Sequence, residues 1–291
     1  MLLSFLLGFN KEKKMRNKEK FILIVLINII LTSCGGNLFQ LTAKKDTSEA
    51  IYQDAKMALD SLDYATAITK ILELQTNDNT FYLRCEKVDG VKICPREDLA
   101  GAYASRCGLN FVSFVSSLTS STGSPFLFTM QKFQTISVTP DQCYEAQKVI
   151  ETFGTSAQRT SDQNLFMAIL GLAKMGTYLR ADADQDQDGS ADAGYSSCDA
   201  SKISTNDLRQ VMSGMGLVLD NLAAVTAVVS GNSSALTDLD TIKSTCGAPC
   251  AITDPESTAF NETVTRMLLR SSDQGIEPSS GCTFAGLDCC P

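Results

Sequence analysis

The chain of 291 residues carries a formal net charge of −8, has no histidine and is 44% hydrophobic. An acidic protein is repelled by phosphate backbones, so the charge argues against nucleic acid as a partner. Without histidine the chain cannot use Ser-His or Cys-His catalysis, and it lacks a common ligand of zinc and haem sites. The absence of tryptophan and an aromatic content of 7% favour helices packed through Ala, Leu, Ile and Met.

The amino-terminal region has the pattern of a secretory signal. Arg16, Lys18 and Lys20 precede the apolar run 21–31, and small residues follow it. The run is shorter than the roughly 20 residues that span a bilayer. We therefore expect residues 1–33 to be a signal peptide. Residues 1–14 add a second apolar run before the basic block, and we interpret them as a start-site error, with translation from Met15.

Leu31-Thr32-Ser33-Cys34 resembles the bacterial lipobox, in which a leucine and two small residues precede a lipidated cysteine. The resemblance implies cleavage before Cys34, diacylglycerol on its thiol, and attachment to a membrane through that lipid. In Gram-negative lipoproteins an aspartate after the cysteine usually retains the protein at the inner membrane. Gly35 stands there instead, which favours the outer membrane. Residues 34–46 are expected to form a tether. The alternative is a buried core helix, which explains neither the basic block nor Cys-Gly-Gly.

Ten cysteines remain beside Cys34, an even number. In an oxidising cell envelope this predicts up to five disulfides, whereas a reduced cytosol would leave free thiols. Residues 47–291 then form one helical domain with a calcium loop at 182–195 and a cysteine-rich tail. The predicted fold class is all-α, built from antiparallel helical hairpins, with one small disulfide-bridged β-hairpin.

Residues 47–75 have apolar residues at helical spacing in two runs, joined near residues 61–63. Asp63-Tyr64-x-x-Ala67-Ile68-x-x-Ile71-x-x-Leu74 resembles the second helix of a tetratricopeptide repeat. Ile51, Ala55 and Ala58 have the spacing of its first helix. The resemblance covers about one repeat and implies a helix pair that stacks with its neighbours to form a peptide-binding groove. An ordinary helical hairpin explains the pattern equally well.

Residues 81–94, FYLRCEKVDGVKIC, predict a β-hairpin around the two-residue turn Asp89-Gly90. Counting outward from the turn, Lys87 faces Lys92 and Cys85 faces Cys94. The two cysteines fall in a non-hydrogen-bonded pair, where the α-carbons are close enough to bridge. We therefore predict a Cys85–Cys94 disulfide, with the two lysines solvated.

Helices are expected over most of the remaining chain. Cys107 and Cys143 are candidates to link neighbouring helices, and Cys246 and Cys250 to close the turn between them. The tail, residues 281–291, has no pattern of its own and is expected to be held by disulfides. The helical pattern covers 95–119, 126–136, 139–153, 161–180, 204–230, 235–245 and 258–269.

The segment 184–192, DQDQDGSAD, carries the one motif with site chemistry. Calcium takes six to eight oxygen ligands, and carboxylates at alternating positions can converge on one ion where a glycine permits a sharp bend. The segment resembles the calcium loops of EF-hands, dockerins and thrombospondin type 3 repeats. That resemblance implies a structural calcium ion bound by Asp184, Asp186, Asp188, the Ser190 carbonyl and Asp192.

The calcium loop departs from the EF-hand pattern at its twelfth position, where Tyr195 replaces a bidentate glutamate. Affinity is then expected to be weak unless Asp182 or Asp199 completes the shell. The alternative is a solvated acidic linker between two helices. Four carboxylates within nine residues repel one another unless a cation is present, which favours the ion.

Three functional hypotheses follow. The first is a non-enzymatic, outer-membrane-anchored scaffold or protein-binding module with an unidentified protein partner. The second is a surface-exposed, calcium-stabilised adhesion or interaction protein. The third is an envelope hydrolase that uses carboxylates and calcium, which would compete with the metal for the one carboxylate cluster.

Overall fold

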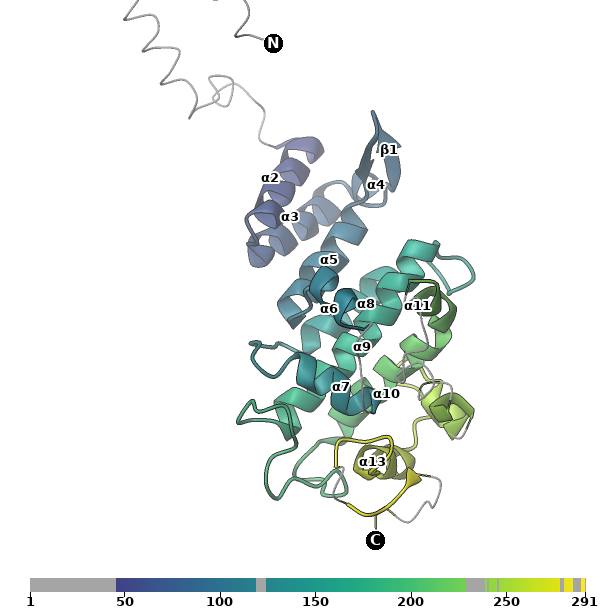
Figure 1. Ribbon diagram of the computed structural model, residues 1–291. Helices are drawn as coiled ribbons and strands as arrows, with labels where there is room; N and C mark the ends of the chain where they lie inside the picture. The colour runs from purple at the N-terminus through teal and green to yellow at the C-terminus, as the bar shows by residue number, and fades with distance from the viewer. Residues whose placement is uncertain are drawn as a thin grey trace, which may run out of the picture. The chain divides into compact units, whose positions relative to one another are not determined.

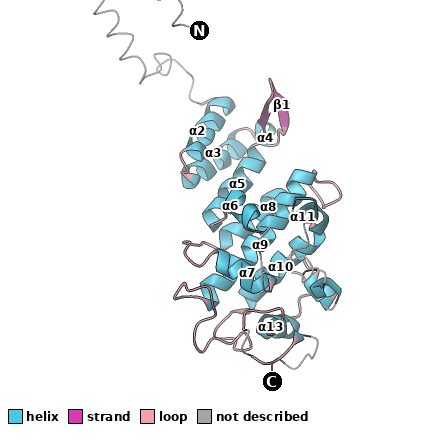
Figure 2. Ribbon diagram, viewed as in Figure 1, coloured by secondary structure: helices cyan, strands magenta, loops and turns pink. Residues whose placement is uncertain are grey.

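The computed structural model describes residues 46–118, 124–228, 239, 241–244, 246–277, 280–284 and 289–290. The chain divides into residues 1–47 and residues 48–291, and the second unit contains all the elements discussed below. It is helical with one two-stranded sheet, so the predicted all-α class with a small β-hairpin is confirmed (Figures 1 and 2). The signal, Cys34 and all but the last residue of the tether lie outside the described residues.

The helices and strands keep the labels of Figure 1. They are α2 (Ser48–Asp60), α3 (Tyr64–Asn77), α4 (Asn79–Tyr82), β1 (Glu86–Val88), β2 (Val91–Ile93), α5 (Pro95–Cys107), α6 (Phe111–Leu118), α7 (Pro125–Lys132), α8 (Asp141–Glu151), α9 (Ser161–Ala183), α10 (Thr205–Asp220), α11 (Leu222–Val228), a 3-10 helix η3 (Ala248–Cys250) and α13 (Glu262–Arg270). No helix among these described segments is long and apolar enough to cross a membrane.

Helices α2 and α3 form the expected hairpin. Asp63 caps α3, because its carboxylate accepts the Thr66 backbone N–H at 3.1 Å. The apolar faces of the two helices form a small core of their own together with α4 and part of α5. Residues 81–82, predicted to begin the β-hairpin, belong instead to the single helical turn of α4. Asp78 caps this turn by accepting the Phe81 N–H at 3.0 Å.

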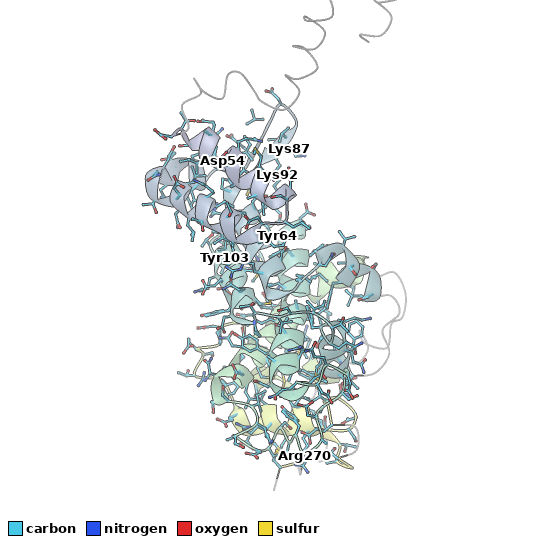
Figure 3. All side chains as sticks on the ribbon, turned by 90° about the vertical axis from the view of Figure 1, so that its left-hand side faces the viewer. Asp54, Tyr64, Lys87, Lys92, Tyr103 and Arg270 are labelled. Carbon is cyan, nitrogen blue, oxygen red and sulfur yellow. A yellow bond between two sulfur atoms is a disulfide. The ribbon has the colours of Figure 1, made fainter. Side chains whose placement is uncertain are left out.

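The β-hairpin has the predicted register. Lys87 pairs with Lys92, and Val88 with Val91. Cys85 and Cys94 are joined, with 4.1 Å between their α-carbons. Lys87 and Lys92 are exposed, and Figure 3 labels both on this hairpin. Lys92 also pairs with Glu97 at 2.5 Å. The bridge and the ion pair hold the hairpin to the start of α5.

The helix predicted over residues 95–119 is two helices, α5 and α6. Gly108 ends α5 with φ of 113°, a left-handed conformation that glycine adopts without steric cost. Asn110 then restarts the helix by accepting the Ser113 N–H at 3.1 Å. Cys107, at the end of α5, is joined to Cys143 of α8, which confirms that pairing.

Helix α9 is the centre of the larger core. It packs against α10 and α7, and two glycines mark the crossing points. A Cβ on Gly171 would lie 2.5 Å from the Gly214 carbonyl oxygen of α10. A Cβ on Gly176 would clash with the Thr129 carbonyl of α7. Both crossings therefore depend on the missing side chain.

The helix predicted over 204–230 breaks after Asp220, so that expectation is corrected to α10 followed by α11. Asn221 ends α10 because its side-chain N–H donates to the Leu217 carbonyl at 2.7 Å. Its carbonyl oxygen accepts from the buried Arg159 at 3.2 Å. The predicted helix at 258–269 begins only at Glu262, after the Asn261 cap. The expected helix at 235–245 lies mostly outside the described residues.

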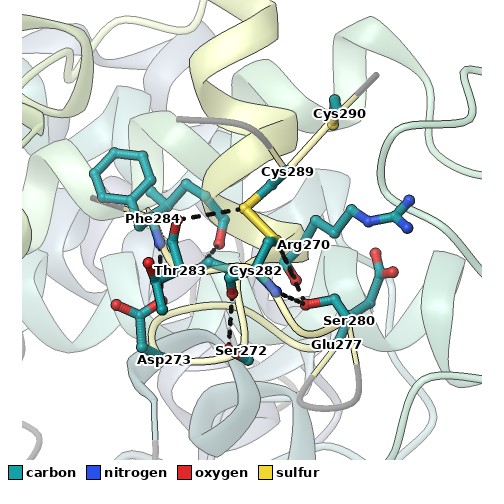
Figure 4. The surroundings of a disulfide bond; sticks show 12 residues. Arg270, Ser272, Asp273, Glu277, Ser280, Cys282, Thr283, Phe284, Cys289 and Cys290 are labelled. Carbon is teal, nitrogen blue, oxygen red and sulfur yellow. Dashed lines mark hydrogen bonds between the residues drawn. A yellow bond between two sulfur atoms is a disulfide. The ribbon is translucent and has the colours of Figure 1, made fainter. Parts of the chain in front are cut away.

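The carboxyl-terminal tail is held by disulfides, as expected. Cys282 is joined to Cys289 (Figure 4). The adjacent Cys290 is joined to Cys198, between α9 and α10. The tail backbone also binds the body, since Asp273 accepts the Phe284 N–H at 3.0 Å. Together with Cys246–Cys250, these bonds place all ten described cysteines in bridges.

Candidate metal site

The acidic loop leaves the carboxyl end of α9, a helix with most of its residues buried. Asp184 is the helix cap and is fully buried, whereas Asp186 and Asp188 are exposed. Gln187 and Gly189 have positive φ values of 66° and 85°. These two residues turn the backbone back on itself, so the alternating aspartates curl around one point.

Backbone N–H groups hold the loop in this conformation. The two carboxylate oxygens of Asp184 accept from Asp188 at 2.9 Å and from Gly189 at 3.2 Å. Asp186 accepts from Asp188 at 3.3 Å, and Asp188 accepts from Ser190 at 2.8 Å. The loop geometry is therefore set by the same carboxylates that the sequence singled out.

Three of the five predicted ligands are brought together. One carboxylate oxygen from each of Asp184, Asp186 and Asp188 lies within 4.8 Å of the others. Two oxygens bound to one calcium ion at 2.3–2.6 Å can be at most about 5 Å apart, so the spacing fits a single ion. Each carboxylate oxygen can accept a backbone N–H and still face a cation.

The electrostatics of the cluster favour a cation. Burial raises the pKa of Asp184, and the neighbouring Asp188 and Asp186 charges raise it further, while the backbone N–H bonds act in the opposite direction. A divalent ion would relieve this repulsion, since it neutralises the like charges that face one another.

Asp192 lies on the loop but outside the group of three. Its carboxylate accepts the N–H groups of Gln185 at 3.1 Å and Asp186 at 3.4 Å. It thereby closes the loop on its first residues. The Ser190 backbone N–H donates to Asp188 and so belongs to the same turn of the loop.

Neither Asp182 nor Asp199, the two residues considered for completing the shell, belongs to the group of three. Asp182 lies on α9, where burial and then the Asp207 charge raise its pKa to about 7. Asp199 accepts the Ser201 N–H at 2.8 Å, in a separate turn. Tyr195, at the twelfth loop position, has a buried hydroxyl without a hydrogen-bond partner among the described residues. The described protein ligands are thus fewer than calcium requires, and water would supply the remainder.

A second polar group lies in the core and was not expected from the sequence. Lys174 of α9 is fully buried, and its Nζ donates to Gln147 Oε1 at 2.7 Å and Ser213 Oγ at 2.9 Å. The Tyr144 ring centroid lies 4.8 Å from the same nitrogen. Burial lowers the pKa of Lys174 to about 7, against the opposing charges of Glu151 and Asp254.

The Lys174–Ser213 pair does not have the arrangement of a Ser-Lys nucleophile. Ser213 is fully buried, and its hydroxyl donates to the Thr253 carbonyl rather than to the lysine. Gln147 also donates to the Thr253 carbonyl, at 2.9 Å. The network therefore joins α8, α9 and α10 to the segment after η3. In the sequence, this buried network is marked by one lysine, Lys174, within the apolar run that forms α9.

The comparisons with known proteins add no assignment: no family model, curated protein or solved structure matches this chain.

Proposed function

We propose that the chain is a lipoprotein anchored to the outer membrane through Cys34, whose residues 48–291 form a non-enzymatic helical scaffold or protein-binding module. The observation that carries this proposal is the cysteine pairing. Ten of the eleven cysteines are in disulfides. The remaining one is Cys34, at the end of the lipobox-like segment. Five disulfides favour an oxidising compartment, and a secretory signal would direct the protein to one.

Calcium is the proposed structural ion of the loop 184–192. It would bind Asp184, Asp186 and Asp188, with Asp192 ordering the loop and the Ser190 carbonyl free to turn inward. The loop joins α9 to the segment that carries Cys198 and then α10. An ion there would fix the end of α9 and stabilise the folded state by mass action.

A scaffold is favoured over an enzyme by the chemistry of the polar groups. The carboxylate cluster has the spacing of a single ion site. The buried lysine is shut off from solvent. The helical hairpins offer binding surfaces without a catalytic group, in keeping with the tetratricopeptide-like pattern.

A surface-exposed interaction protein is the second candidate. The β-hairpin favours it, because Val91 at its tip is 66% exposed and the bridge behind it keeps the tip rigid. Protease treatment of intact cells separates the two. Cleavage without permeabilisation would place the protein on the cell surface, and protection would place it in the periplasm.

Lipidation is tested by labelling cells with radioactive palmitate. The wild-type protein should incorporate label and fractionate with membranes, while Cys34→Ala should do neither. Serine replacement of Cys198, which lies in the folded unit, is the matched control and should leave labelling intact. Unlabelled wild-type protein with reduced thiols in the cytosol would refute the proposal.

Calcium binding is tested by titration followed by thermal unfolding. At a calcium concentration ten times Kd, binding stabilises by about 1.4 kcal/mol, and extracellular sites of this kind have Kd values of roughly 0.1–1 mM. Asp186→Asn should remove the shift in midpoint. Asp199→Asn, a nearby aspartate outside the cluster, should retain it. An unchanged wild-type midpoint up to several millimolar calcium would exclude the site.

A further inference from the structure

A cavity of about 320 Å³ is lined by residues of α5, α6, α8 and α9. Figure 1 labels these four helices. Its aromatic wall is made by Phe111 of α6 and Phe166 of α9, whose rings stack nearly parallel with centroids 6.1 Å apart. Both rings are only partly buried. The face of an aromatic ring carries negative electrostatic potential and attracts organic cations.

The charged residues that line the cavity are all acidic: Glu97, Asp98 and Asp162. Two of the three charges are already balanced. Glu97 pairs with Lys92 at 2.5 Å, and Asp98 with Lys56 at 3.3 Å. Asp162 is exposed and has no hydrogen bond or ion pair with any residue that the structure describes. The cavity therefore retains one negative charge, which one cation would complement.

The polar side chains of the cavity are held in place. Gln163 is 6% exposed, accepts the Thr160 N–H at 3.0 Å and donates to Glu97 at 2.9 Å. The Tyr52 hydroxyl donates to Asp98 at 2.5 Å. Binding would not need to order these groups, which lowers the entropy cost of filling the cavity.

The apolar surface continues outside the cavity along α6. Val112, next to Phe111, is 78% exposed, and Val115 is partly exposed. The buried face of α6 is formed by Phe114 and Leu118, so Val112 contributes nothing to the core. A free small cation would fill the cavity and leave this strip uncovered. A polypeptide with apolar residues beside a cationic one would cover both.

We propose that this cavity and the adjoining strip of α6 form a docking site for a partner polypeptide that inserts an arginine side chain flanked by apolar residues. The guanidinium group lies against the Phe111 and Phe166 rings with its charge facing Asp162. Arginine suits the site because its planar guanidinium is weakly hydrated and stacks on aromatic rings. The inference rests on the proposed binding-module function and gives it a site.

The probe is a capped peptide, Leu-Val-Arg-Val-Leu, titrated against the folded protein and followed by backbone amide NMR shifts. The matched probe replaces arginine by citrulline, a neutral group of the same shape. We expect shifts at the cavity residues and at least tenfold weaker binding of the citrulline peptide. Equal affinities, or no binding of the arginine peptide, would overturn the proposal. Capped arginine alone should bind at least tenfold more weakly, and equal binding would mean that the site takes a free small cation.

Two variants test the residues. Asp162→Asn should weaken the arginine peptide about five- to tenfold and leave the citrulline peptide unchanged, because it removes the unbalanced charge. Phe166→Leu should weaken both peptides. Glu49→Gln, also exposed in the first turn of a helix but outside the cavity lining, should change neither. Asp162→Asn with wild-type affinity would exclude the site.

Failure of this inference is distinguishable from failure of the proposed function. A partner that co-purifies equally with wild-type protein and with Asp162→Asn and Phe166→Leu would leave the binding module standing and place its contact elsewhere. Loss of the partner with these two variants, and its retention with Glu49→Gln, supports the site only together with the arginine–citrulline difference.

Discussion

Replacing Lys174 by methionine should flatten the pH dependence of stability. Lys174 is fully buried, and burial lowers its pKa from 10.5 to about 7. Between these values the unfolded chain binds more protons than the folded protein, so the free energy of unfolding rises with pH. Below pH 7 the folded protein carries the full cost of a buried charged amine.

The magnitude follows from the two pKa values. At about 1.36 kcal/mol per pH unit, the whole window amounts to about 5 kcal/mol, of which about 3 kcal/mol falls between pH 6 and pH 9. Urea unfolding followed by far-UV circular dichroism gives the free energy at each pH. The difference in free energy of unfolding between wild type and Lys174→Met should change by about 3 kcal/mol from pH 6 to pH 9. Glu151 and Asp254 are present in both proteins, so their own titration cancels from this difference.

Lys148→Met is the matched control. Lys148 is exposed, and its Nζ lies 5.0 Å from the centroid of the same Tyr144 ring. The control should keep the wild-type dependence of unfolding free energy on pH, because folding does not bury the Lys148 amine. If the curves of wild type and Lys174→Met run parallel from pH 6 to pH 9, the buried amine does not titrate in this range and the reasoning is wrong.

Three further predictions concern packing, hydrogen bonding and connectivity. Gly176→Ala should destabilise by about 1–3 kcal/mol in urea unfolding, because its Cβ meets the α7 backbone, whereas Gly101→Ala, with open space around it, should stabilise by about 0.5–1 kcal/mol. The buried Arg266 donates to two backbone carbonyls and to a carboxylate, so Arg266→Lys should cost about 1–3 kcal/mol, and an unchanged urea midpoint would count against those bonds. Peptide mapping without reduction should find Cys289 and Cys290 in two different disulfides, one to Cys282 and one to Cys198. Linkage of both to the same partner cysteine peptide would contradict this connectivity of the tail.

The β-hairpin could be predicted from the sequence because its geometry is local. A two-residue turn at Asp89-Gly90 fixes the register, and the register fixes which cysteines face each other. The curl of Asp184, Asp186 and Asp188 is local for the same reason, since each carboxylate binds a backbone N–H within five residues.

The helix breaks were missed because apolar periodicity continues across them. Gly108 and Asn221 both lie inside apolar patterns of helical spacing. Gly108 ends its helix by its left-handed backbone and Asn221 by its capping hydrogen bonds, and the spacing of apolar residues reveals neither. Asp182 was one of two residues considered for completing the calcium shell. On a helix, residues two apart point in nearly opposite directions, so Asp182 lies beside Asp207 instead.

The core network and the cavity could not be predicted because they join residues that are distant in sequence. Lys174 meets Gln147 and Ser213 only after three helices have packed. Phe111 meets Phe166 across 55 positions, because α6 lies against α9. The spacing of apolar residues relates positions that are near in sequence, and it does not determine which helix faces meet.

The bridge between Cys198 and Cys290 has a consequence for biosynthesis. It joins positions 92 residues apart, and Cys246, Cys250, Cys282 and Cys289 lie between them. When such a chain enters an oxidising compartment with its amino terminus leading, Cys198 meets several cysteines that are not its native partner before Cys290 enters. Pairing in order of emergence would trap Cys198 with Cys246. Maturation should therefore depend on an isomerase that reshuffles such bonds, and cells without one should accumulate mispaired, protease-sensitive protein.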